Sequence, residues 1–449
     1  MTRSPGERRG LLFQLLISGA MKGGGGLLTF ACFIFIARAA SAEQYGLFSI
    51  LFSIAMLACY VIVGGQHTAI LKVYPRVSEE GPMSAAGGYV TGLALRRIGL
   101  IALAAFGAAI PVWFVLSALA GDIGLTIDLP LVLWTVALSI LLGLAEFFSS
   151  FFRARGMLLA GMWPRDILWR GFMIVFFGAA LFLYAPITFR ADLFSASALI
   201  AWTAALLLIA LGIQILRLAM DWRRIVRDEG LDRNGLNADM NASFWSFWGL
   251  GLIWPARGQL GTIVVGLMIS PEVAGAFFSA QRLASVLLMV SVAINTAMGP
   301  QISRAFAAND FDKAKRVFGT ASIVAGGTSA AFMIVLLFFG ADLLALFDPA
   351  YSNFAPVLLV LALGQALFNA CGPLGVLLTL ADRERQVLWS AIVATAATLI
   401  GVIVFTGRYG AMGAAVVMAV VTVALNLYLA GIGREVFASA KKTHSKVDG

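Results

Sequence analysis

Long apolar runs alternate with short polar segments along the whole chain. Each run holds roughly 20 or more mainly apolar residues, the length with which a helix crosses about 30 Å of hydrocarbon. No segment shows the alternation expected of strands in a membrane barrel. The pattern therefore predicts an all-α integral membrane protein with about twelve transmembrane helices, placed at 11–37, 44–71, 97–120, 130–152, 165–185, 193–217, 244–269, 272–298, 317–340, 354–380, 386–406 and 411–433.

One segment, 221–243, is polar over a greater length than the other connections. It divides the predicted helices six and six. We therefore predict a six-helix bundle over 1–220, a cytoplasmic linker loop over 221–243, and a second six-helix bundle over 244–449 that ends in a short basic tail.

Composition agrees with this pattern. Of the 449 residues, 60% are hydrophobic and 12% are charged, and mean hydropathy is +0.92. A soluble domain is about 25% charged, so this chain lacks the polar surface that water requires. Lipid is the expected surroundings of most side chains, and membrane lipids are expected partners.

Basic residues set the predicted orientation. With both termini in the cytoplasm, nearly all of the 32 Lys and Arg fall in cytoplasmic segments. The external loops then hold only Arg38, Arg190 and Arg408. This positive-inside bias predicts a multi-pass membrane protein whose N- and C-termini are both cytoplasmic. It also accounts for the net charge of +9, so no nucleic-acid partner is expected.

The two halves of the sequence repeat. Ser41, Glu43, Gly46 and Phe48 recur at the same spacing in the segment that begins at Ser270, an offset of 229 positions (41 to 270). Six helices per half make the repeat parallel. It predicts two lobes related by a pseudo-two-fold axis along the membrane normal, with a cavity between them, and it favours alternating access over a channel.

These residues resemble a known family. Ala37-Arg38 with Ser41–Ser49 is similar to the "A-R-x-L-G-x-x-x-Y-G-x-F/Y" signature of polysaccharide transporters, the oligosaccharidyl-lipid flippases of the multidrug/oligosaccharidyl-lipid/polysaccharide (MOP) superfamily. Pro271-Glu272 with Gly275 and Arg282-Leu283 resembles their "P-E-x-x-G-x-Y-x-x-A-x-R-L" segment. The chain departs from the family where Arg257-Gly258-Gln259 replaces a frequent Asp-Arg pair.

The resemblance implies a flippase of the bacterial inner membrane rather than an enzyme, with no cofactor. Its substrate would be an undecaprenyl-diphosphate-linked oligosaccharide, the repeat unit of an O-antigen or exopolysaccharide, moved from the cytoplasmic to the periplasmic leaflet. A polysaccharide polymerase and a chain-length regulator are the expected protein partners in lipopolysaccharide or exopolysaccharide biosynthesis.

Three cations lie deep in predicted helices: Lys22, Arg257 and Arg282. Each costs about 2.5–3.5 kcal/mol at mid-membrane on insertion scales. This cost indicates a hydrated cavity, an ion pair or an anionic ligand. A lipid diphosphate suits Arg and Lys, so these residues are candidates for binding the head group. A buried pair or a hydrogen bond between helices is the alternative.

Helix-breaking residues adjoin two of these cations. Gly23, Gly24, Gly25 and Gly26 follow Lys22. Pro255 and Gly258 flank Arg257. Interrupted helices in corresponding halves mark transport sites or bending points, so these residues are candidate hinges. Close packing of small residues between helices is the other interpretation.

Other polar residues are weaker candidates. Gln66 and His67 lie near the cytoplasmic end of the second helix and are candidate entrance residues, and Gln259 and Gln281 are candidates for binding sugar hydroxyls. Glu146, the clearest deep acid, is a candidate ion-coupling residue, with pairing to a nearby Arg such as Arg153 as the alternative. The three cysteines have no metal-ligand spacing, so no metal site is expected.

Two other transporters of the superfamily remain alternatives. A multidrug extruder would bind cationic drugs and couple their export to Na⁺ or H⁺ through buried acids, which the sequence shows sparsely. A lipid II flippase resembles a longer layout of fourteen helices.

Overall fold

The computed structural model describes residues 24–78, 83–121, 128–184, 194–223, 231–242, 244–308, 310–381 and 383–445. These residues form helices and contain no strand. The chain is therefore all-α over its described part, as the sequence predicts.

Two compact units make up the chain. Unit 1 contains the residues up to Ile34 and those from Leu260 onward, and unit 2 runs from Phe35 to Gln259. The chain thus passes from one unit to the other inside the first described helix, Gly24–Arg38, and again inside α10 (Phe244–Met268). The domain boundaries predicted at 220 and 244 stay predictions.

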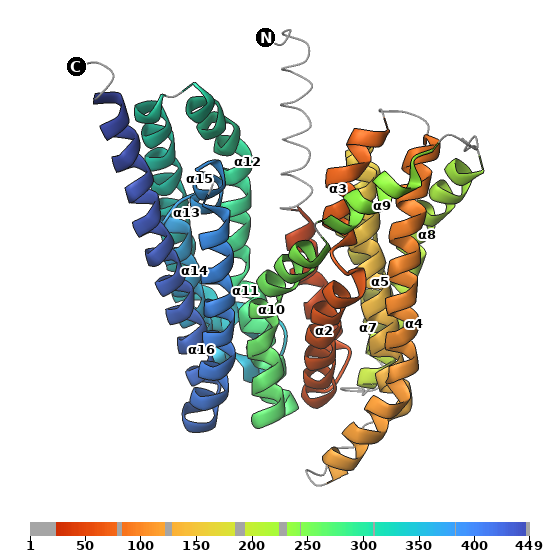
Figure 1. The fold of residues 1–449 in the computed structure, drawn as a ribbon. Helices are drawn as coiled ribbons and strands as arrows, with labels where there is room; N and C mark the ends of the chain where they lie inside the picture. Colours follow the sequence, from red (N-terminus) through yellow and green to blue (C-terminus); the bar gives the residue numbers. More distant parts are fainter. Residues whose placement is uncertain are drawn as a thin grey trace. The chain divides into compact units, whose positions relative to one another are not determined.

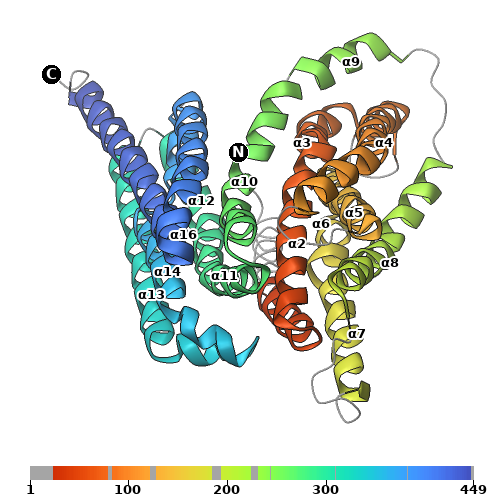
Figure 2. The same cartoon turned by 90° about the horizontal axis from the view of Figure 1, so that it is seen from below.

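Unit 2 is organised around α5. Helices α2, α3, α4 and α8 all pack on α5 (Figure 1, Figure 2). The buried face of α5 carries Phe147, Phe148, Phe151 and Phe152. The described elements of this unit after the first helix are α2 (Ala42–Val63), α3 (Gln66–Val77), α4 (Ala85–Gly121), α5 (Leu129–Ala154), α6 (Leu158–Trp163), η1 (Pro164–Leu168), α7 (Trp169–Tyr184), α8 (Ala196–Trp222) and α9 (Arg233–Ala242).

The second predicted helix is broken. A single helix over 44–71 is expected, but α2 ends at Val63 and α3 begins at Gln66. Gly64 and Gly65 between them have φ of 55° and 69°. This left-handed conformation costs an L-amino acid roughly 1–2 kcal/mol, whereas glycine adopts it freely. The glycine pair therefore fixes the position of the break. Hydropathy could not reveal it, because glycine is compatible with an apolar run.

The fifth predicted helix contains a π turn. The backbone N–H of Trp169 donates to the carbonyl of Pro164, five residues earlier. Pro164 has no N–H, so it cannot bond the carbonyl of Ala160 as a regular helix would. Gln214 of α8 supplies this donor instead, with its Nε2 2.7 Å from the Ala160 oxygen. The helical segment that contains this turn begins at Leu158 rather than at the predicted 165.

Unit 1 is organised around α14. Helices α11, α13 and α16 pack on α14. A Cβ atom at Gly364 of α14 would lie 2.7 Å from the Cα of Ala419, so glycine permits this close approach. Besides the end of α10, the elements of the unit are α11 (Pro271–Ala284), α12 (Val286–Ala307), α13 (Phe311–Ala345), η2 (Pro349–Phe354), α14 (Ala355–Ala370), α15 (Leu374–Leu380) and α16 (Glu384–Ser445).

Breaks also divide predicted helices of unit 1. The expected helix 272–298 is α11 and α12, which meet at Ser285. The expected helix 354–380 is interrupted before Pro373, where Gly372 has a φ of 77°. The last two predicted helices are both in α16, with non-helical backbone at Gly410. In unit 2, the linker predicted as a loop contains the helix α9.

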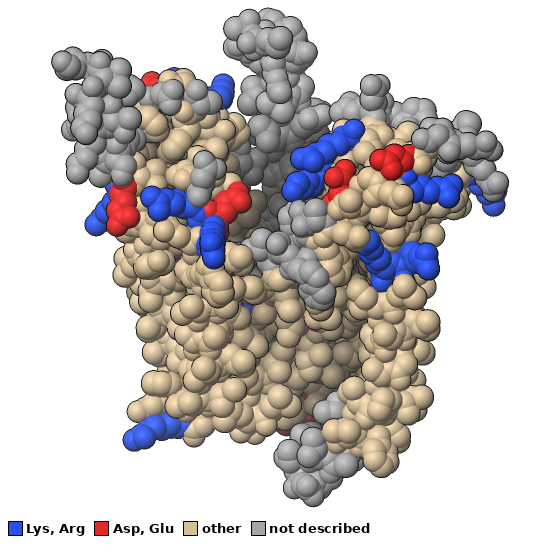
Figure 3. Space-filling model, viewed as in Figure 1, with Lys and Arg blue, Asp and Glu red and all other residues tan. Residues whose placement is uncertain are grey.

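The described helices suit a membrane. Eight of them are long and apolar enough to cross one. Large apolar side chains cover their outer faces, such as Phe182 with 83% of its surface exposed. In each unit, the Lys, Arg, Asp and Glu side chains visible in Figure 3 gather mainly toward one end, and tan surface covers most of the remainder. The chain is a multi-pass membrane protein.

Candidate ion-coupling and substrate residues

Two carboxylates lie inside unit 2 and share one arginine. Arg165 of η1 forms an ion pair with Glu146 of α5, and its Nε lies 3.4 Å from Oδ1 of Asp166. Arg170 of α7 is also 3.4 Å from that oxygen. We name Glu146, Arg165, Asp166 and Arg170 the carboxylate–arginine cluster. Its four side chains are at most 29% exposed, so their charges interact in surroundings less polar than bulk water.

The backbone helps to hold this cluster. Nη1 of Arg170 donates to the carbonyl oxygen of Arg165 at 2.9 Å, within the π turn. Turns of this kind occur frequently at functional sites. The cluster therefore contains two acidic and two basic side chains beside the π turn. Arg165 can exchange its ion pair with one carboxylate for a pair with the other.

The sequence identified only part of this cluster. The sequence indicates Glu146 as a candidate but not Asp166, because position 166 lies at the edge of the predicted helix 165–185. The structure places Asp166 inside the helix that begins at Leu158, and this residue is 9% exposed. Glu146 pairs with a nearby arginine, as the alternative interpretation predicts, but that arginine is Arg165 rather than Arg153. Arg153 instead donates to the Ser149 carbonyl and to Ser150 Oγ, each at 3.1 Å.

Gln66 and His67 begin α3, directly after the glycine break. Gln66 is fully buried, and its Nε2 donates to the Gly64 carbonyl at 3.3 Å. Its Oε1, like Nδ1 of His67, has no hydrogen-bond partner among the described residues. The first turn of a helix also presents unsatisfied N–H groups. The break therefore concentrates polar groups in the interior of unit 2, and the entrance role of both residues stays a prediction.

The break and the cluster are neighbours. Arg153 and Arg165 lie within electrostatic range of His67. The ring of Tyr60, near the end of α2, meets the His67 ring edge-on at 6.0 Å between centroids. An irregular second helix and an irregular fifth helix thus border one polar region, although each is interrupted for a different reason.

The candidates on α10 lie in a continuous helix. Residues 251–268 are helical through Pro255 and Gly258, so neither residue interrupts the helix. Gln259 is 7% exposed and Arg257 is half-buried. Both belong to unit 2. Their substrate roles, and bending at Pro255 and Gly258, stay predictions.

Arg282 and Gln281 belong to unit 1. The guanidinium carbon of Arg282 is 4.5 Å from the ring centroid of Phe278 and 5.6 Å from that of Phe33. These rings hold the cation by cation–π attraction. Oε1 of Gln281 accepts a hydrogen bond from Thr262 Oγ1 at 3.1 Å. The aromatic contacts give Arg282 a partner that the sequence did not suggest.

The glycine-rich segment is described only in part. Lys22 and Gly23 lie outside the described residues. Gly24, Gly25 and Gly26 are helical. A side chain at Gly26 would collide with Met289 of α12, which supports close packing there, while a hinge role for these glycines stays a prediction.

No metal centre emerges from the described residues. They contain no group of three or more His, Cys, Asp or Glu side chains that could hold a metal ion. Within the same part of the chain, Cys32, Cys59 and Cys371 form no disulfide. The candidate residues themselves are carboxylates, cations and amides, which are suited to proton or ion exchange and to charge recognition.

Comparison with known proteins identifies the fold. The MatE family model matches residues 252–406. No curated protein matches the sequence. A multidrug resistance MATE family transporter of the MOP superfamily, in an inward-facing conformation, is similar with a TM-score of 0.71 and 15% identity, over 93% of this chain and 96% of that one.

Two further structures agree. A mutant MATE transporter from Vibrio cholerae has a TM-score of 0.58 and 16% identity, over 97% of this chain and 98% of the other. A MOP superfamily transporter from Pyrococcus furiosus, for which reverse polarity of the binding pocket suggests a different function, has a TM-score of 0.62 and 14% identity, over 96% of each chain. The chain therefore has the two-lobe fold of MATE transporters. These comparisons support the MATE fold and do not single out the polysaccharide transporters.

Proposed function

We propose that this protein is a secondary transporter of the multidrug MATE type, which exports amphipathic molecules by alternating access and is driven by a proton or cation gradient. The carboxylate–arginine cluster is the observation that carries the proposal. This choice reverses the order of the sequence-based hypotheses, since the matching family model and the similar structures are of MATE transporters.

The two carboxylates give the cluster two charge states. Glu146 and Asp166 both depend on Arg165, and Asp166 also has Arg170. Binding of a proton or cation to one carboxylate weakens its attraction to Arg165, which then interacts more strongly with the other. Because Glu146 is on α5 and Asp166 is in η1, this exchange would shift the relative stability of two arrangements of these helices. A bound ion drives transport in this way if it favours one arrangement.

Neutral variants of the carboxylates test the coupling. We expect Glu146→Gln and Asp166→Asn each to reduce the gradient-driven transport of a fluorescent cationic dye at least tenfold. The reason is that the ion can no longer change the charge of the cluster. The measurement is dye flux with an imposed pH or Na⁺ gradient, in proteoliposomes with equal amounts of protein.

Asp221→Asn is the matched control. Asp221 forms an ion pair with Arg155 in the same unit but outside the cluster. Equal loss of flux in all three variants would assign the effect to general damage to unit 2. Full gradient-driven flux in the Glu146→Gln, Asp166→Asn double variant would contradict ion coupling at the cluster.

A second candidate function is export of a lipid-linked oligosaccharide. Arg257 and Arg282, within apolar helices of units 2 and 1, favour an anionic substrate, because a cationic drug would be repelled by them. The Pyrococcus furiosus transporter is a similar chain whose binding pocket has reverse polarity. Arg suits bidentate contacts with a diphosphate.

Charge-removing variants distinguish the two functions. If the substrate is a lipid diphosphate, Arg257→Gln with Arg282→Gln should trap complete lipid-linked repeat units in the cytoplasmic leaflet, at normal protein abundance. The measurement is leaflet assignment of lipid-linked oligosaccharides extracted from a deletion strain complemented with each variant.

The same strains give the opposite result for a drug exporter. Normal polysaccharide export, together with greater sensitivity to cationic drugs in the deletion strain, would reject the flippase and support the multidrug function. Arg282→Lys retains the positive charge and serves as the control for loss of the aromatic packing around Arg282.

A further inference from the structure

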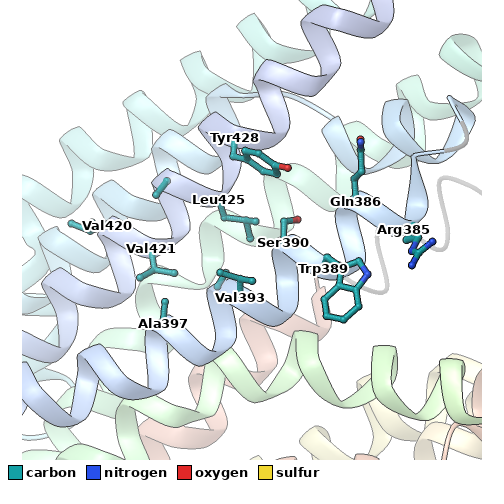
Figure 4. A pocket seen from close by; sticks show the side chains of 12 residues that line it. Arg385, Gln386, Trp389, Ser390, Val393, Ala397, Val420, Val421, Leu425 and Tyr428 are labelled. Atoms are coloured by element: carbon teal, nitrogen blue, oxygen red, sulfur yellow. The ribbon is translucent and has the colours of Figure 1, made fainter.

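A groove of about 740 Å³ runs between the two helical segments of α16 that meet at Gly410. Its volume lies within the range of roughly 300–1,000 Å³ typical of small-molecule sites. Residues 385–397 line one wall and residues 420–428 the other, and Figure 4 shows their side chains facing a common space. The groove lies entirely in unit 1.

The groove has a polar end and an apolar end. Arg385, Gln386, Ser390 and the hydroxyl of Tyr428 lie toward one end in Figure 4, whereas Val420 and Ala397 lie toward the other. The polar end carries the first turn of α16, which the positive-inside distribution predicts to be cytoplasmic. Trp389 and Tyr428, 56% and 57% exposed, supply the aromatic rings that favour the level of lipid head groups.

The length of the groove fits one leaflet. From 385 to 397 a helix rises roughly 18 Å at about 1.5 Å per residue. Half of the hydrocarbon core is about 15 Å. The groove therefore extends from the interface to the middle of the bilayer, and an acyl chain of the cytoplasmic leaflet can follow its apolar walls.

Charge at the mouth distinguishes this groove from its counterpart in the other half of the sequence. A second groove, of about 870 Å³, lies between α7 and α8, the fifth and sixth predicted helices of that half, and has no charged residue in its lining. At the first groove, Arg385 is exposed and makes no ion pair with a described carboxylate. The neighbouring Glu384 is exposed as well, so the mouth offers one guanidinium to an anionic group without being strongly basic.

We propose that the α16 groove binds one anionic phospholipid of the cytoplasmic leaflet. An acyl chain lies along Val393, Ala397 and Val421, and the phosphate contacts the Arg385 guanidinium. Both classes of lipid carry a phosphate, but Arg385 repels the ammonium group of a zwitterionic head group, so an anionic lipid is selected. The aromatic rings of Trp389 and Tyr428 fix the depth of the head group. The site does not depend on which substrate the transporter carries.

Native mass spectrometry of the purified full-length protein tests the site. The probes are phosphatidylglycerol and phosphatidylcholine with identical acyl chains, added at equal concentration to delipidated protein. We expect one phosphatidylglycerol molecule to be retained preferentially, and Arg385→Gln to lower its retention about fivefold, the effect of roughly one basic residue on anionic-lipid binding. Ala424→Trp fills the groove and should displace either lipid.

Arg408→Gln is the matched control. Arg408 lies near the end of the same helical segment, just before Gly410, and its guanidinium carbon is 5.9 Å from the centroid of the Tyr409 ring. Unchanged thermal unfolding of the variants would show that they fold. Equal retention of the two lipids, equal losses for Arg385→Gln and Arg408→Gln, or undiminished binding by Ala424→Trp would overturn the proposal. Lipid-free protein pairing through this face, seen as a dimer that Ala424→Trp dissociates, would overturn it too.

Discussion

Replacing Arg165 with alanine should strongly destabilise the protein, because it removes the cation that two carboxylates of unit 2 share. The variant removes the ion pair of Glu146 and leaves Asp166 paired with Arg170. Breaking a fully buried pair costs about 3–5 kcal/mol. Because these side chains are up to 29% exposed, we expect a smaller decrease in the free energy of unfolding, of about 2 kcal/mol. Thermal unfolding in detergent, followed by fluorescence or by loss of the monodisperse peak, measures the change.

The neutral double variant Glu146→Gln, Arg165→Gln is the control for this prediction. It removes both charges of one pair and keeps the pair between Asp166 and Arg170, so it should recover most of the lost stability while still lacking ion coupling. If the double variant is as unstable as Arg165→Ala, packing around Arg165 rather than its charge accounts for the loss.

Replacing Gly64 with valine should have a comparable effect by a different route. A β-branched residue at a φ of 55° is strained, and the added Cβ would approach Cδ1 of Ile101 at 3.1 Å. We expect the free energy of unfolding to decrease by about 2 kcal/mol. We also expect a large decrease in transport, because rebuilding a continuous helix would displace Gln66 and His67. The midpoint of thermal unfolding and the dye-flux or leaflet assay measure the two effects.

Gly99→Ala provides the comparison for Gly64→Val. Gly99 lies within α4, and an added Cβ there meets nothing within 4 Å. Since alanine favours a helix over glycine by about 1 kcal/mol, this control should be neutral or slightly stabilising. Normal stability and transport in Gly64→Val would show that the break after α2 is not required.

Hydrophobic patterning predicted the fold class well, because the bilayer imposes one length on every spanning helix. Helices such as α5 and α13 contain the predicted spans 130–152 and 317–340. Patterning could not locate interruptions inside a span. Gly64, Gly372 and Pro164 keep a segment apolar while changing its hydrogen bonds, and only the neighbouring helices decide whether the backbone continues through them.

The candidate site was harder to predict for an electrostatic reason. Sequence gives the depth of a charge along its own helix, but a pair such as Glu146 with Arg165 depends on two helices and on the π turn. Arg153 was an equally reasonable partner by position. Arg282 illustrates the same limit, since its contact with Phe33 joins residues far apart in the sequence.

The places where the chain changes units determine whether either half of the sequence contains a whole unit. Residues before Phe35 belong with the second half of the sequence, and the first part of α10 belongs with the first half. Each half therefore donates the beginning of its own first helix to the bundle completed by the other, as exchanged arms do in a swapped dimer. A chain cut within the linker 221–243 would therefore leave neither piece with all the residues of one compact unit.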